Sequence, residues 1–173
     1  MRHLTLITTG GTIEKTYDER TGLLENRGSI VTRMLRRLRL DNTSADIVEL
    51  MSKDSLLMTD ADRDAIVAAV RRAAEPARIT GVLVLHGTDT LCQTGERIHG
   101  AIPSPRVPII LTGAMRPFEM KRSDALQNLT EAVFGAGVLA PGVWCVAHGR
   151  ALRFPGVVKD RENGTFVPAG ERA

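Results

Sequence analysis

The sequence is poor in aromatic residues and in cysteine. Only 3% of its 173 residues are Phe, Trp or Tyr, so a hydrophobic core would have to be built from aliphatic side chains. Two cysteines, Cys92 and Cys145, are too few for a disulfide framework. Because Cys145 lies in an apolar strand-like run and Cys92 in a predicted helix, we interpret both as packed thiols rather than as catalytic ones.

Long hydrophobic runs and an N-terminal signal segment are also lacking. No apolar stretch approaches the roughly 18 residues that a membrane span requires. The first three residues, Met1-Arg2-His3, lead directly into a short strand-like run. We therefore expect a protein that does not bind membranes and that is located in the cytoplasm.

Motifs for metals and nucleotides are absent as well. The four histidines do not have the spacing of metal ligands, and no CxxC pair occurs. Gly10-Gly11 fits neither the GxGxxG fingerprint nor the phosphate-binding GxxxxGK[ST] pattern. We therefore predict no metal site and no cofactor.

The charge is modestly positive, with a net charge of +3 and a sequence pI near 9.2. Much of the excess lies in one predicted helix, in Arg33, Arg36, Arg37 and Arg39. The sequence lacks the aromatic interleaving of single-strand binders and any recognised nucleic-acid motif. A solvated helix face or a subunit contact is favoured over a nucleic-acid surface, and no nucleic-acid partner is predicted.

The sequence does contain a regular alternation of strand-like and helix-like segments. Apolar runs predict strands at 4–7, 46–50, 81–85, 107–111 and 142–147, with a further short strand near 165–167. Helical patterns occur at 29–40, 59–74, 89–101 and 123–135. This alternation predicts an α/β fold of the flavodoxin or Rossmann type, a three-layer α/β/α arrangement around a largely parallel, mixed sheet.

Two of the predicted strands end in turns that carry threonine hydroxyls. TTGGT at 8–12 follows the first strand, and HGTDT at 86–90 follows the strand 81–85. In open α/β sheets, ligands bind beyond the carboxyl ends of the strands. Because threonine needs a base or polarising partner to act as a nucleophile, a threonine-based active site is one interpretation. The alternative is that Thr12, Thr88 and Asp89 only stabilise turns or cap helices.

Two further residues are candidates for the proton chemistry. Tyr17 is the only tyrosine and lies in the polar segment 13–28, which we interpret as a lid because loops of this length are usually functional. Lys159 follows Val157-Val158, and a desolvated lysine has a lowered pKa and can act as a base. The alternatives are a packing role for Tyr17 and a surface position for Lys159.

Taken together, these segments resemble the bacterial-type L-asparaginase family of threonine amidohydrolases. The matching segments are TTGGTI at 8–13, DS at 54–55, HGTDT at 86–90, TGAMRP at 112–117, SD at 123–124, NL at 128–129 and the region of Lys159. TGGTI followed by HGTDT is a highly specific pair, and the resemblance spans almost the whole chain. The length is similar to that of short-chain family members. We therefore expect a single asparaginase-like catalytic domain over residues 1–173 that resembles the family's N-terminal domain, with the C-terminal domain absent.

The resemblance implies a catalytic role for five residues. Thr12 would be the nucleophile, and Tyr17 would be the lid tyrosine that hydrogen-bonds it. Thr88, Asp89 and Lys159 would form a second triad, in which Lys159 tunes Thr88 and Asp89 holds the α-ammonium group of the substrate. Which of the two threonines forms the first covalent bond is left open.

The resemblance also implies a substrate-binding set. Ser55 would bind the α-carboxylate with Asp54 beside it, and Ala114 would offer a backbone carbonyl near the leaving amide. Backbone N–H groups at the two threonine turns would stabilise the oxyanion. The full substrate-binding set is Gly11, Asp54, Ser55, Gly87, Thr88, Asp89 and Ala114.

The implied activity is the hydrolysis of L-asparagine to L-aspartate and ammonia through a threonine acyl-enzyme. Leu56 stands where longer relatives often have a polar residue, so one substrate contact is missing. In longer relatives the second domain completes the site from a neighbouring subunit, so we expect a homodimer or a larger homo-oligomer. Two alternatives are a non-catalytic amino-acid-binding or regulatory protein, and an amidotransferase subunit supported by the arginine-rich segment 29–40.

Overall fold

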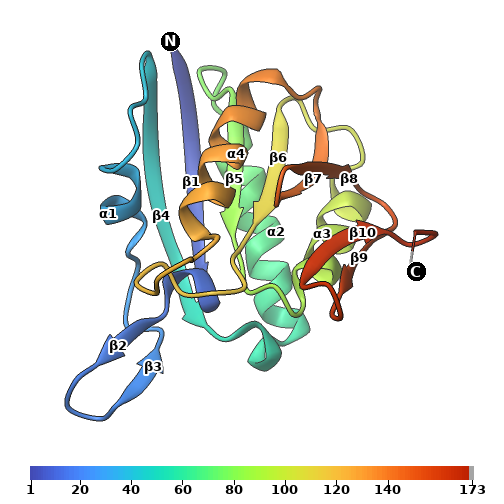
Figure 1. Ribbon diagram of the computed structural model, residues 1–173. Helices are drawn as coiled ribbons and strands as arrows, with labels where there is room; N and C mark the ends of the chain where they lie inside the picture. The colour runs from blue at the N-terminus through green and yellow to red at the C-terminus, as the bar shows by residue number, and fades with distance from the viewer. Residues whose placement is uncertain (172–173) are drawn as a thin grey trace.

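The computed structural model describes residues 1–171 and shows helices on both faces of a central sheet (Figure 1). The sheet has six strands in the order β4-β1-β5-β6-β7-β8. In that order they span Thr43–Lys53, Arg2–Gly10, Gly81–Leu85, Pro108–Thr112, Gly142–Ala147 and Arg150–Arg153. Neighbouring strands run parallel except for the pair β7 and β8, which is antiparallel. The predicted three-layer α/β fold with a largely parallel, mixed sheet is confirmed.

The central strands are apolar on both faces because helices cover both faces. Every residue of β5 and of β6 is buried. Val82 and Val84 belong to the cluster that also holds residues of α2 (Asp60–Ala74) and α3 (Leu91–Ala101). Leu83 and Leu85 point to the other face, where they join residues of α1 (Val31–Leu35) and α4 (Ala125–Val138). The alternation follows from the two-residue period of a strand.

The start of α2 is fixed by side-chain hydrogen bonds that its sequence predicts. The Thr59 hydroxyl accepts the N–H of Asp62, and the Asp62 carboxylate accepts the N–H of Thr59 at 2.8 Å. This reciprocal pair is a capping box, which satisfies two backbone donors at the helix N-terminus. The expected capping arrangement and the expected end of the helix near Ala74 are both confirmed.

The predicted helix over 29–40 is wrong in length. Only α1, five residues long, is α-helical, and the chain continues in turns to Leu38. The Ser29 hydroxyl, expected to cap a long helix, donates to the carboxylate of Glu14 at 2.5 Å. The arginines at 33, 36 and 37 would share one side of a longer helix, where like charges destabilise it.

Several predicted bounds shift, and one strand is much longer than predicted. The expected strand 46–50 is β4, which extends over eleven residues because it pairs with β1 along almost its whole length. Tertiary pairing therefore extends a strand whose ends are polar. The predicted helix 89–101 begins at Leu91, the predicted strand 107–111 is shifted by one residue, and the predicted helix 123–135 runs from Ala125 to Val138.

Two small hairpins lie outside the main sheet. In the segment 13–28, a 3-10 helix, η1 (Thr12–Glu14), leads into the hairpin of β2 (Thr16–Asp18) and β3 (Leu23–Glu25). The C-terminal hairpin pairs β9 (Val157–Asp160) with β10 (Thr165–Pro168), which includes the short strand predicted near 165–167. Figure 1 shows the first hairpin projecting from the body, to the lower left, and the second on the right of the lower edge of the sheet.

Both cysteines are free, and Cys145 is buried. Burial raises the pKa of the Cys92 thiol to about 11 and also raises that of Cys145, so both thiols are protonated at neutral pH. This agrees with their interpretation as packed thiols. Among residues 1–171, no helix combines the length and the apolar character needed to cross a membrane.

Candidate active site

The site is built at the edge of the sheet where β1, β5 and β6 end. Thr8 of β1 is aligned with Leu85 of β5, and Leu85 is aligned with Thr112 of β6. The turns that follow these three aligned residues are therefore neighbours. They are residues 9–12, 86–90 and 113–117, which include the threonine turns identified in the sequence.

The first two turns touch through their backbones at Gly11 and Gly87. A Cβ atom on Gly11 would lie 2.4 Å from both Cα and N of Gly87, and Gly11 has a φ of 77°. Only glycine fits this conformation and this contact without strain. Thr12 and Thr88 each follow directly after a glycine of this contact, so the two hydroxyl-bearing residues start from adjoining backbone.

Thr88 has a lysine partner from the C-terminal hairpin. The Lys159 ammonium donates to the Thr88 hydroxyl at 2.8 Å and to Asp89 Oδ1 at 3.0 Å. Thr88 is only 4% exposed, and the Lys159 side chain is 14% exposed. The structure therefore brings Thr88, Asp89 and Lys159 together, and it does not place Lys159 on the open surface.

Asp89 has a second cationic partner that sequence reasoning missed. Arg161 Nη1 donates to Asp89 Oδ1 at 2.8 Å from the turn between β9 and β10. Arg161 follows Lys159 by two positions in the sequence, but it lies in the turn after β9, so its contact with Asp89 depends on how the hairpin packs. Burial alone would raise the pKa of the Asp89 carboxyl, but hydrogen bonds and charges from Lys159 and Arg161 hold it below its usual value.

Thr12 and Tyr17 are not joined by a hydrogen bond. Thr12 is half-buried, and within residues 1–171 its hydroxyl has no hydrogen-bond partner. The Tyr17 hydroxyl lies near Gly22 of the same hairpin, and Tyr17 is 57% exposed. The backbone N–H of Tyr17 donates to Glu119 at 3.1 Å, which connects the hairpin to the loop after β6.

Glu14, two residues after Thr12, is a second residue that sequence reasoning missed. Its side chain is buried, accepts the N–H of Gly10 at 3.0 Å and accepts the Ser29 hydroxyl at 2.5 Å. Burial raises the pKa of the Glu14 carboxyl to about 7. The carboxyl thus connects Gly10, at the start of the Thr12 turn, to Ser29, directly after the segment 13–28. Nothing in that polar segment signalled a buried carboxyl.

Asp54 and Ser55 lie against the Thr88 turn. Ser55 is buried, and a Cβ atom on Gly87 would lie 2.5 Å from Ser55 Oγ. Asp54 pairs with Lys15 at 2.8 Å. Its side chain also accepts the N–H of Leu56 and so caps the short helix η2 (Ser55–Leu57). The structure therefore places both predicted substrate-binding residues beside the turn that carries Thr88.

The loop after β6 is held by polar side chains from α4 and its N-terminus. Ala114 is buried, and Asn128 donates to the carbonyl oxygen of the preceding Gly113 at 2.9 Å. Asp124 accepts the N–H of Met115 and pairs with His148 at 2.8 Å. These contacts give the SD and NL segments a structural role, because they fix the position of Ala114.

His86 supports the same edge from inside the protein. Its imidazole contacts the carbonyl oxygen of Gly87 at 2.8 Å and the Thr94 hydroxyl at 2.9 Å. Burial lowers the pKa of His86 to about 4, so the ring is neutral at physiological pH. His86 is thus a satisfied core residue that holds the Thr88 turn.

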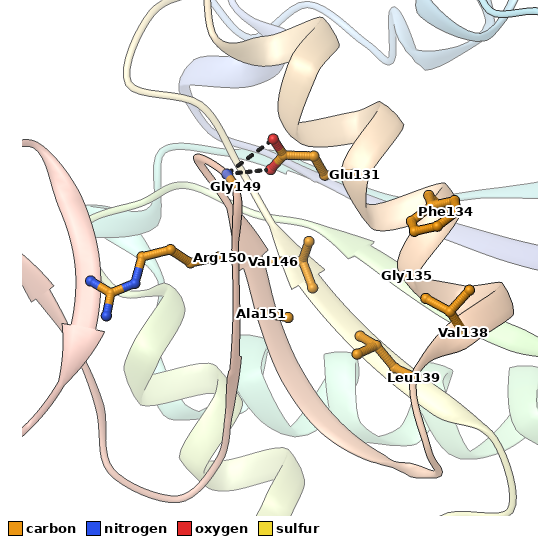
Figure 2. Close-up of a pocket in the computed structure, with 9 residues that line it drawn as sticks. All are labelled: Glu131, Phe134, Gly135, Val138, Leu139, Val146, Gly149, Arg150 and Ala151. Carbon is orange, nitrogen blue, oxygen red and sulfur yellow. Dashed lines mark hydrogen bonds between the residues drawn. The ribbon is translucent and has the colours of Figure 1, made fainter.

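A separate hollow of about 240 Å³ lies between α4 and the strands β7 and β8 (Figure 2). Its wall is largely apolar and includes Phe134 and Val138, while Glu131 accepts the backbone N–H of Gly149 at its rim. It contains none of the predicted site residues. Among residues 1–171, no three His, Cys, Asp or Glu side chains are grouped as metal ligands.

Known proteins resemble this chain both in sequence and in structure. Residues 3–165 match the family model described as Asparaginase, N-terminal. The L-asparaginase of Thermococcus kodakarensis is 30% identical over 141 residues, which cover 82% of this chain and 42% of that protein. A Glutamyl-tRNA(Gln) amidotransferase subunit from Methanococcus vannielii is 29% identical over 157 residues, or 86% of this chain and 35% of that protein.

The solved structure of the thermostable L-asparaginase from Thermococcus kodakarensis superposes with a TM-score of 0.87 at 28% sequence identity. The match covers 96% of this chain and 51% of that one. The chain thus spans about half or less of the length of these relatives. The family model covers nearly the whole chain, and the sequence motifs lie at the neighbouring strand ends described above. The chain belongs to the asparaginase family.

Proposed function

We propose that this protein is an amidohydrolase that hydrolyses L-asparagine to L-aspartate and ammonia. The main support is the hydrogen bond of 2.8 Å from Lys159 to the Thr88 hydroxyl. Thr88 follows Gly87 and Thr12 follows Gly11, so both threonines adjoin the contact between these two glycines. A hydroxyl with an adjacent amine, next to a second hydroxyl, is an arrangement suited to nucleophilic catalysis.

The proposed reaction has two steps and uses no cofactor. The Thr12 hydroxyl attacks the amide carbon, the amide nitrogen leaves as ammonia, and a threonine ester remains. Water then attacks the ester carbon, and one of its protons passes through the Thr88 hydroxyl, held by the Lys159 ammonium, to the Thr12 oxygen as the ester C–O bond breaks. This restores the Thr12 hydroxyl and releases aspartate, whose new carboxyl group loses its proton to solvent. Backbone N–H groups of the turns at Gly11 and Gly87 would stabilise the oxyanion in both steps.

The Thr12 hydroxyl needs a partner for this reaction, and within residues 1–171 it has no hydrogen bond to a side chain. Tyr17 is our candidate, since it lies on the hairpin that follows η1 directly and its side chain is largely free to move. Closure of this hairpin over Thr12 would bring the two hydroxyls together and exclude water. In this proposal Ser55 and Asp54 contact the rest of the substrate, and Ala114 lies near the leaving amide.

The defining experiment is an ammonia-release assay with L-asparagine, L-glutamine and D-asparagine. We expect release from L-asparagine that is linear in time and in protein concentration. Absence of ammonia from all three amides would contradict the proposed hydrolysis. Calorimetric binding of L-asparagine without ammonia release would instead support the non-catalytic amino-acid-binding alternative.

A second candidate function is that of an amidotransferase subunit. The similarity to the Glutamyl-tRNA(Gln) amidotransferase subunit from Methanococcus vannielii over 86% of this chain favours it. Exposed arginines at 33, 36 and 37, in and after α1, would supply phosphate contacts. This function requires tRNA binding that weakens steeply as salt rises, and failure to bind tRNA at low salt would exclude it.

We also propose that the active form is a homodimer or a larger homo-oligomer. The support is the family membership, because the resemblance implies that a neighbouring subunit completes the site. Sedimentation of the protein at assay concentration tests this proposal. A catalytically active monomer would contradict it.

A further inference from the structure

The carboxylates at the candidate site are already paired with cations. Asp54 pairs with Lys15, and its side chain is 34% exposed. Asp89 pairs with two cations, Lys159 and Arg161. Three cationic side chains therefore face two carboxylates, and the excess positive charge lies at Asp89.

Arg161 is the member of this group that can contact a ligand. Its guanidinium reaches Asp89 through one nitrogen, and its side chain is 67% exposed. A guanidinium has five N–H donors arranged to bind a carboxylate through two parallel hydrogen bonds. Most of these donors remain available on the solvent side of Asp89.

We propose that Arg161 sets the substrate class, so that the site prefers primary amides with a carboxylate but no free α-ammonium group over L-asparagine. The proposal rests on the amidohydrolase function given above. A free α-ammonium group at Asp89 would be the third cation around this carboxylate, after Lys159 and Arg161. It would have to compete with Arg161 for the Asp89 oxygens. A carboxylate placed there gains charge-assisted hydrogen bonds from Arg161 instead.

The rim next to Ser55 favours the same class. Leu56 and Leu57 follow Ser55 and are 66% and 73% exposed. Apolar side chains offer no acceptor to an ammonium group, which would lose hydration beside them without compensation. They do not penalise a methylene group, such as the α-carbon of succinamate, where hydrogen replaces the ammonium group of L-asparagine.

The test compares kcat/KM for ammonia release from succinamate, N-acetyl-L-asparagine and L-asparagine. We expect the wild-type protein to prefer succinamate over L-asparagine by roughly tenfold, the size of one charge-assisted hydrogen bond. Arg161→Ala should remove most of this preference by raising kcat/KM for L-asparagine relative to succinamate, and Arg161→Lys should be intermediate. N-acetyl-L-asparagine, which lacks the ammonium, should follow succinamate in its response to both variants.

Arg78→Ala is the matched control. Arg78 is also an exposed arginine paired with one aspartate, Asp46, but it precedes β5 and so lies at the amino end of that strand. Its substitution should leave the ratio of the two substrates unchanged. The ratio separates recognition from structure, because loss of a merely structural contact would lower kcat for all substrates in the same proportion.

A wild-type preference for L-asparagine would overturn the proposal, as would an equal loss for all substrates in Arg161→Ala. Calorimetry distinguishes this failure from failure of the amidohydrolase function. If no amide releases ammonia, tighter binding of succinamate than of L-asparagine would still support the role of Arg161, while tighter binding of L-asparagine would refute it.

Discussion

The two threonine turns differ in how their hydroxyls are held. Thr88 is buried, and its hydroxyl already accepts a hydrogen bond from Lys159. Thr12 is half-buried, and within residues 1–171 its hydroxyl has no hydrogen-bond partner. It is followed by a projecting hairpin (Figure 1). One turn is therefore complete before substrate arrives, and the other has to be completed by the substrate or by Tyr17.

The strongest way to test this comparison is to remove each hydroxyl. We expect Thr12→Ala and Thr88→Val each to lower kcat for ammonia release on the order of 10⁴-fold, because the reaction requires both hydroxyls and loss of either one removes most of the catalysis. For the same reason the double variant should lose little more than either single variant. Thr130→Ala is the control, since the Thr130 hydroxyl donates to the Leu126 carbonyl oxygen within α4, away from both turns. Losses that multiply would show that the two turns act independently.

Removal of the lysine should have the next largest effect. Lys159→Met keeps a flexible unbranched side chain, one atom shorter, and loses the donor to Thr88, so kcat should fall on the order of 10²- to 10³-fold. The ester formed on Thr12 should then accumulate, because only its hydrolysis is proposed to use this pair. Mass spectrometry after quenching would detect the added mass. An unchanged kcat would remove Lys159 from the mechanism.

A methyl group between the two turns should disturb both of them. Gly11→Ala places Cβ against Gly87, whereas Gly149 has nearly the same φ, 75° against 77°, with no atom within 4 Å of its Cβ position. Both substitutions strain the backbone, but only the first creates a clash. We expect the free energy of unfolding in urea to fall by about 3 kcal/mol in Gly11→Ala and by about 1 kcal/mol in Gly149→Ala. If both variants lost the same free energy of unfolding, the two turns could move apart without destabilising the protein.

The smallest predicted effect concerns the pH dependence of stability. Glu14, on the Thr12 side, has its pKa raised by burial from 4.5 to about 7. Between pH 4.5 and 7 this carboxyl is therefore protonated in the folded protein and ionised in the unfolded chain. Its contribution to stability therefore falls as pH rises from 4.5 to 7. His86, on the Thr88 side, has its pKa lowered from 6.5 to about 4, so its contribution falls as pH decreases through this range. The two slopes oppose each other.

Glu14→Gln should expose the slope of His86. The amide preserves an acceptor for the Gly10 N–H but cannot ionise, so the variant should exceed the wild type in stability by about 2 kcal/mol at pH 8 and match it near pH 4.5. Urea denaturation at pH 4.5, 6 and 8 measures this difference. A wild-type advantage at pH 8 would show that the charged carboxylate, despite its burial, stabilises the Thr12 turn.

Features that depend on local pattern could be predicted from the sequence. β5 is an apolar run between polar segments, and α2 begins at a Thr-x-x-Asp cap, so both were identified within a few residues. The Lys159–Thr88 contact joins residues 71 positions apart, and its prediction required the family resemblance. Residues whose role depends on tertiary packing, Glu14 and Arg161, were missed because composition does not reveal which polar side chains become buried or paired.

The errors in the predicted elements have the same origin. The helix over 29–40 has a regular apolar spacing, and the Ser29 hydroxyl accepts the Val31 N–H at its start. The arginines at 33, 36 and 37 would repel one another on one face of a longer helix, and only Val31–Leu35 is helical. β8 and β9 have only four residues each, and they form strands because β7 and β10 supply partners. A sequence window does not contain those partners.

The long strand β4 forms one edge of the sheet, and this position affects the tendency of the protein to aggregate at high concentration. Its eleven residues have a partner strand, β1, on one side only, and none of them is fully buried. An unpaired edge of this length is a template for strand addition by another molecule. Asp46, Glu49 and Lys53 place charges along it, which makes such addition unfavourable, so replacing them with β-branched residues should convert a dispersed protein into one that aggregates.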